Sequence, residues 1–169
     1  MKNLVLMLVA VLSLTIVSCG GVDKELAGKM QKDLEEMNGT GATLEELGKN
    51  IANLTGQMNA APEAMKSDVG SGLQPFLEMA NTMIQKQQAT LAEYNDLMSK
   101  LKTLSADYGA GKIQTEQAAK EYETLKKGLQ GISDVTGRIK ERSVRMETNF
   151  AKMTADWNAR HESGAAPSK

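Results

Sequence analysis

The stretch from Leu91 to Ile132, LAEYNDLMSKLKTLSADYGAGKIQTEQAAKEYETLKKGLQGI, decides the fold class. Apolar residues recur every three or four positions on both sides of Gly109 and Gly111, a spacing typical of amphipathic α-helices. Glycines commonly end helices, and Thr115 is a suitable N-cap for a helix that follows. Because only a few residues join the two helices, the pattern predicts an antiparallel hairpin.

The same spacing continues far from the turn in both directions. On the first helix, the main row consists of Leu77, Ala80, Ile84, Gln87, Leu91, Tyr94, Met98, Leu101, Ser105 and Tyr108. A flanking row on the same helix consists of Phe76, Met83, Thr90, Leu97 and Leu104. The second helix carries Ala118, Tyr122, Leu125, Leu129, Ile132, Thr136, Ile139, Ser143, Met146, Phe150, Met153 and Trp157. Folding about the turn brings apolar residues opposite each other in most layers, for example Met98 opposite Leu125. We therefore expect a coiled-coil hairpin over about 73–108 and 115–160.

The periodicity of residues 24–72 is weaker. A short apolar row from Leu26 to Met37 stops at Asn38-Gly39-Thr40-Gly41, which predicts a break. Thr43 and Glu46 then have the spacing of a capping box, so a new helix is expected to start there and to end at Ala61-Pro62. Strand patterns are nearly absent. The sequence predicts an all-α protein, an elongated helical bundle whose shorter N-terminal helices cover one face of the hairpin.

Composition excludes several functional classes. The 169 residues include 20 Lys+Arg and 21 Asp+Glu, a formal charge of -1, with one His and one Cys. The length suits one domain, and the charge gives no reason to expect nucleic-acid binding. One His and one Cys cannot form a His/Cys metal site or a disulfide. We expect no catalytic residues, no metal and no non-covalent cofactor; a hydrolase with paired carboxylates is the least favoured hypothesis, since no acid/base pair stands out.

The first 18 residues have the pattern of a signal peptide. Lys2 precedes an apolar run from Leu4 to Leu12, which is too short to span a bilayer. The end of this segment, Ile16-Val17-Ser18-Cys19, resembles the lipobox of bacterial lipoproteins. The resemblance implies cleavage before Cys19, a diacylglycerol on its thiol and an N-acyl chain, such as palmitate, on its new amino group. An ordinary secretory signal is the alternative, but it would leave a free thiol in an oxidising compartment.

This resemblance also implies the organisation of the chain. We expect a cleaved signal over 1–18, a lipidated N-terminus and short tether over 19–23, a helical bundle over 24–161 and a disordered tail over 162–169. Gly20 stands where an Asp would retain lipoproteins of enteric bacteria in the inner membrane. The implied location is therefore the outer membrane, on its periplasmic or its surface face, if the host is Gram-negative. His161 is expected near the start of the tail and is assigned no role.

Three glycines in the second long helix are candidate functional residues. Gly128, Gly131 and Gly137 each cost about 1 kcal/mol relative to Ala in a helix interior. They indicate a hinge or the close approach of a partner helix. The alternative is that they only weaken the helix locally and have no functional role.

A basic row follows in the same helix. Arg138, Arg145 and Lys152 repeat every seven residues, with Arg142 beside them. They predict a contact face for anionic headgroups or cell-wall polymer. Because Glu141 lies among them, an ordinary solvated face is the alternative.

These features favour a membrane-anchored lipoprotein that acts as a structural or interaction protein, a scaffold or adaptor in the cell envelope. Its expected partners are the membrane, through the lipid, and an unidentified envelope protein or the cell wall. The alternative is a periplasmic holdase-type chaperone or assembly factor that holds unfolded clients in methionine-lined gaps. Homo-oligomers are also possible, because uncovered amphipathic helices can pair between chains.

Overall fold

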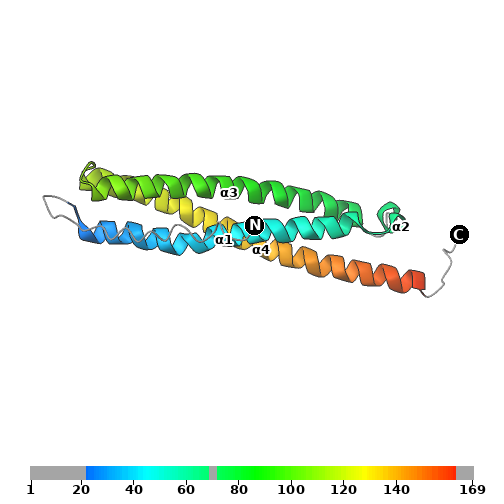
Figure 1. Ribbon diagram of the computed structural model, residues 1–169. Coiled ribbons are helices and arrows are strands. Elements are labelled where there is room, and N and C mark those ends of the chain that lie inside the picture. Colours follow the sequence, from blue (N-terminus) through cyan, green and yellow to red (C-terminus); the bar gives the residue numbers. More distant parts are fainter. Residues whose placement is uncertain (1–21, 69–71, 163–169) are drawn as a thin grey trace, which may run out of the picture.

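A computed structural model describes residues 22–68 and 72–162. These residues form four helices, α1 (Lys24–Asn59), α2 (Glu63–Ser67), α3 (Leu73–Gly109) and α4 (Thr115–Glu162), and no strand. The three long helices lie side by side in an elongated bundle, and the short α2 sits where α1 gives way to α3 (Figure 1). The predicted all-α helical bundle is confirmed. The predicted signal peptide, lipidation site and most of the tail lie outside the described residues.

The predicted hairpin is formed by α3 and α4, whose bounds lie within two residues of the expected ones. Gly111 adopts a left-handed φ of 70° in the turn, a conformation that glycine accepts without strain. The turn is closed by the Lys112 N–H, which donates to the Asp107 carbonyl at 2.9 Å. On α4, every predicted core position from Ala118 to Met146 is buried, and the three positions beyond Met146 are half-buried.

On α3 the buried surface is wider than one row, because this helix packs against both α1 and α4. Met83, Thr90 and Leu104, which were expected at the flank, are buried. Leu77 and Ile84 of the main row are only half-buried. The three long helices all pack against one another, and α3 makes the most extensive contacts of the three.

The predicted break at residues 38–41 is wrong, because α1 continues through it without interruption. Thr43 does not cap a new helix either; its hydroxyl donates within α1 to the Gly39 carbonyl at 2.9 Å. The packing explains why glycine is present. Gly41 is buried, and a Cβ there would lie 2.6 Å from Cε1 of Tyr94 on α3. At this position glycine allows close helix packing and does not end the helix.

The position of α1 along α3 is fixed by buried polar side chains. The Tyr94 hydroxyl donates to the Met37 carbonyl at 2.9 Å, and the Gln87 amide donates to the Leu44 carbonyl at 2.7 Å. Both carbonyls belong to α1, and the residues four positions later are Gly41 and Gly48. A helical side chain covers the turn that precedes it, so glycine at these sites leaves the two carbonyls open to a second donor.

The same register continues to the start of α1. The N–H of Asp23 donates to the Tyr108 hydroxyl at 2.6 Å, and in all three pairs the two residue numbers add up to 131. Met30 and Leu101 fit this register, and both are fully buried in the same core cluster. Repeated every seven residues, these contacts give α1 one antiparallel alignment on α3.

We expect Gly41→Ala to lower the free energy of unfolding by about 1–3 kcal/mol, because the added methyl overlaps the rigid Tyr94 ring. Gly39→Ala is the matched control two residues away in the same helix. Nothing lies within 4 Å of a Cβ at Gly39, so this variant should gain up to about 1 kcal/mol from helix propensity. Urea unfolding of both variants checks the difference; equal effects would contradict the proposed role of Gly41.

Candidate functional site

The N-terminus of α1 is tied to the α3–α4 turn. Asp23 caps α1 by accepting hydrogen bonds from the N–H groups of Glu25 and Leu26 at 2.8 and 3.3 Å. The Tyr108 hydroxyl, which accepts from the Asp23 N–H, also shares a hydrogen bond with the Thr115 hydroxyl at 3.1 Å. One buried tyrosine thus joins the start of α1, the end of α3 and the start of α4.

This joint limits where the predicted lipid can be. Cys19 itself lies outside the described residues, but it precedes Asp23 by only four positions. Four residues span about 14 Å at most when fully extended. A lipid on Cys19 would therefore be attached close to the end of the bundle that holds the α3–α4 turn.

A second polar joint connects α1 with α4. The Tyr122 hydroxyl donates to a carboxylate oxygen of Asp33 at 2.7 Å, and the Lys126 ammonium lies 3.8 Å from the same oxygen. Burial, and then the hydrogen bond and charge of Asp33, raise the pKa of Tyr122 well above its usual value. Burial also raises the pKa of Tyr94. Both tyrosines are neutral donors that hold the bundle together.

These contacts predict how stability depends on alkaline pH. The pKa of Tyr122 is higher in the folded protein than in the unfolded chain, where it is about 10. The contribution of Tyr122 to the free energy of unfolding is therefore fully present below about pH 10. It decreases above this pH, because the unfolded chain releases a proton that the folded protein retains. By about pH 11 this group alone should lower the free energy of unfolding by about 1 kcal/mol.

Urea unfolding at about pH 9 and about pH 11 measures this loss, with Tyr122→Phe as the comparison. The variant keeps the lysines, which titrate in the same range, and lacks only the phenol. It should be about 1–3 kcal/mol less stable at neutral pH, since it loses a hydrogen bond to a charged group, and should depend less on alkaline pH. The same pH dependence in both proteins would contradict this account.

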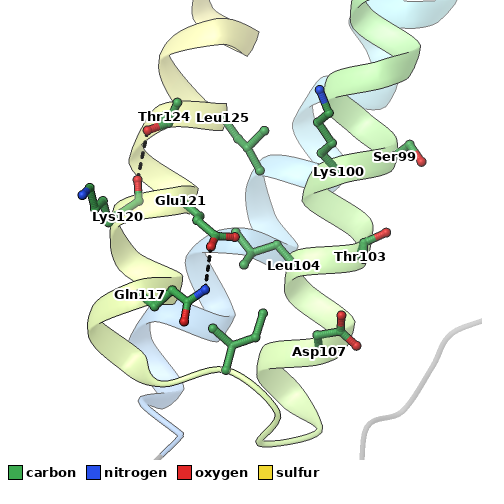
Figure 2. Close-up of a pocket in the computed structure, with 11 residues that line it drawn as sticks. Ser99, Lys100, Thr103, Leu104, Asp107, Gln117, Lys120, Glu121, Thr124 and Leu125 are labelled. Carbon is green, nitrogen blue, oxygen red and sulfur yellow. Dashed lines mark hydrogen bonds between the residues drawn. The ribbon is translucent and has the colours of Figure 1, made fainter.

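Two grooves open between α3 and α4, and no residue of α1 lines either of them. The first, of about 680 Å³, lies next to the turn (Figure 2). The side chains of Leu104 and Leu125 point between the two helices there. The charged groups around them are of mixed sign: Lys100, Asp107, Lys120 and Glu121. This groove is amphipathic but has no preferred charge.

The second groove, of about 630 Å³, lies between the early part of α3 and the later part of α4. Its lining consists of Phe76, Met79, Thr82, Met83, Arg142, Arg145, Met146 and Asn149. Among the described residues, no Asp or Glu lines it. Arg142 forms no ion pair within the described part of the chain, and Arg145 has only a 4.0 Å contact to Glu141 of its own helix, with both side chains largely exposed. This groove is apolar at its base and positively charged at one edge.

Of the four predicted basic residues, two line the second groove and two lie outside it. Arg142 and Arg145 line the second groove, whereas Arg138 and Lys152 are exposed on α4 seven residues before and after Arg145. Because seven residues are close to two helical turns, these two lie on the same side of α4 as Arg145. The sequence identified the basic row but not the apolar residues of α3 that face it.

The three glycines of α4 have different surroundings. Helix α4 is continuous through all of them. A Cβ at Gly128 would lie 3.0 Å from a methyl group of Leu97, so here the two helices approach closely. Nothing lies within 4 Å of a Cβ at Gly131 or Gly137. Close approach thus accounts for Gly128 only, and a hinge at these glycines stays a prediction.

His161 lies in the last turn of α4 and not in the tail, because the helix runs to Glu162. Its ring stacks on that of Trp157 with centroids 3.9 Å apart, and its Nδ1 is 2.8 Å from the Trp157 carbonyl oxygen. The imidazole therefore extends the apolar row of α4 by one turn, a packing role that the helical spacing of four residues could have indicated.

Comparisons with protein-family models, with curated proteins and with solved structures give no match to this chain. In the described ranges, no three His, Cys, Asp or Glu side chains are grouped so that they could hold a metal ion. No helix among the described residues has the length and apolar character needed to cross a bilayer. A proposal of function therefore depends on the resemblance of residues 16–19 to a lipobox, on the joint at Tyr108 and on the two grooves.

Proposed function

We propose that the mature chain is a lipid-anchored protein of the bacterial cell envelope that acts as a scaffold or adaptor. Its lipid would be a diacylglycerol and an N-acyl chain on Cys19, and two or three acyl chains anchor a protein far more stably than one. Gly20 supports the outer membrane as the location in a Gram-negative host. The bundle would then present the outer side of α3 and α4 to an envelope protein or to the cell wall.

The hydrogen bond between the Asp23 N–H and the Tyr108 hydroxyl supports this proposal, because it holds Asp23, four residues after Cys19, at the turn end of the bundle. It fixes the entry of the chain at the turn end, within about 14 Å of the lipidated residue. Helix α4 starts at this end and has 48 residues, or a length of about 72 Å. An anchored bundle that stands upright would hold the second groove about 40–50 Å from the membrane surface.

The chaperone alternative has less support. A holdase needs broad apolar surface to bind unfolded chains, but Met79 and Val144 are the exposed large apolar residues of the described ranges. A surface with two such residues suits one defined partner better than many unfolded ones.

Envelope fractionation with intact-mass analysis tests the proposal. We expect the native protein to carry the mass of its acyl chains at Cys19 and to fractionate with the outer membrane. Cys19→Ala should lack this mass and should not be cleaved before position 19. In a Gram-negative host, Gly20→Asp should move the protein to the inner membrane, and Gly20→Ala is the matched control that should not. A mature protein without acyl mass would overturn the proposal.

A further inference from the structure

We propose that the second groove is a docking site for an amphipathic helix with acidic flanks, contributed by a partner protein. This inference rests on the proposed scaffold function and specifies the chemistry of its partner. The groove comprises Phe76, Met79 and Met83 on one wall, Met146 at the base, and Arg142 and Arg145 on the other wall.

The shape of the groove fits a helix. Its walls are two antiparallel helices, and the lining runs from Phe76 to Met83 on α3 and from Arg142 to Asn149 on α4. Each wall is about 10 Å long, or two helical turns. Helix α1 contacts both α3 and α4 and lines neither groove. The same pair of helices thus already packs one helix, and the second groove offers a place for another.

The apolar part of the groove is incompletely covered by the chain itself. Met79 is 49% exposed, whereas Met83 and Met146 beneath it are almost completely buried. Methionine side chains are flexible and polarizable, so they adapt to the side chains of a docked helix. A partner residue placed over Met79 would remove one of the two exposed large apolar side chains of the described ranges from water.

The charge of the groove selects an acidic partner. Arg142 and Arg145 are three residues apart and therefore neighbours on one face of α4, and Arg138 and Lys152 extend this basic face at both ends. Because no described acidic residue lines the groove, the described part of the chain places no counter-charge across from these cations. A second copy bound symmetrically would bring like charges together. A cell-wall polyanion would satisfy the charges but would leave Met79 in water. An anionic bilayer could take up Met79 as well, but an upright bundle holds this groove about 40–50 Å from the membrane, which favours an amphipathic protein helix.

The first groove is the internal comparison. It has a similar volume and also an apolar base, but its charged residues are of both signs. It should therefore not distinguish an acidic helix from a basic one, and substitution of its lysines serves as the matched control.

Peptide binding to the mature protein, purified as the cell processes it, tests this proposal. The probe is a fluorescent amphipathic peptide of about 18 residues with leucines along one face and glutamates on both flanks. Two peptides are controls: one has lysine in place of glutamate, and the other has the same composition in scrambled order. Fluorescence anisotropy measures binding of each peptide to the native protein, to Arg142→Ser/Arg145→Ser and to Lys100→Ser/Lys120→Ser. Circular dichroism first shows that each variant is folded.

We expect the acidic peptide to bind the native protein and Lys100→Ser/Lys120→Ser equally well, and Arg142→Ser/Arg145→Ser about tenfold or more weakly. Met79→Asp should also weaken binding, because it places a carboxylate against the apolar face of the peptide. The lysine and scrambled peptides should bind poorly to all proteins. Equal binding of all three peptides, or no loss in Arg142→Ser/Arg145→Ser, would overturn the proposal.

Two further measurements distinguish other occupants. The first is binding to phosphatidylglycerol vesicles. If the native protein binds these vesicles, Arg142→Ser/Arg145→Ser does not, and the acidic peptide binds neither protein, the proposal is overturned in favour of a lipid surface. Self-association seen by sedimentation and abolished by the same variant would overturn it in favour of a second copy. Because the peptide assay does not depend on acylation, failure of lipidation at Cys19 and failure of helix docking are separate results.

Discussion

The bundle depends on how two buried donors of α3 are satisfied. Tyr94 and Gln87 point into the contact with α1, where an unpaired hydroxyl or amide would cost about 1–3 kcal/mol. Their acceptors are main-chain carbonyls, which have a second lone pair free after the helical hydrogen bond. Gly41 and Gly48 allow the donors to reach these carbonyls. A shift of α1 by one residue would place side chains over the carbonyls and leave both donors unpaired.

The alignment of α1 has consequences at both ends of the bundle. It brings Asp23 to Tyr108, so the chain enters the fold at the α3–α4 turn, and it places Asp33 beside Tyr122. Because α1 uses one side of α3 and α4, the grooves on these two helices stay free of it. Polar contacts inside the bundle therefore determine which outer surface is available to partners.

The sequence predicted the hairpin well because its heptad rows are long and a glycine turn separates them. It did not predict the continuity of α1. Glycine ends a helix in one context and permits close packing in another, and here the outcome depends on Tyr94, which lies 57 residues from its acceptor Met37 in the chain. Local patterns such as the capping box at Thr43 contain no information about a partner on another helix.

The candidate site was predictable in part for a related reason. Arg142 and Arg145 are one turn apart, so helical periodicity alone places them together. Whether Met79 faces them depends on the rotation of α3 relative to α4, which no spacing along one helix specifies. Similarly, the role of Tyr108 at the chain entry requires three segments to meet, and the apolar row alone predicted only that it would be buried.

A double-mutant cycle between Gly41→Ala and Tyr94→Leu tests most directly whether this contact aligns α1. If the alanine methyl is harmful because it overlaps the Tyr94 ring, its cost should largely disappear once the ring is replaced by leucine. Urea unfolding of the four proteins should then give a coupling free energy of about 1–3 kcal/mol. Effects that add to within about 0.5 kcal/mol would contradict the account, since residues that do not interact behave in this way.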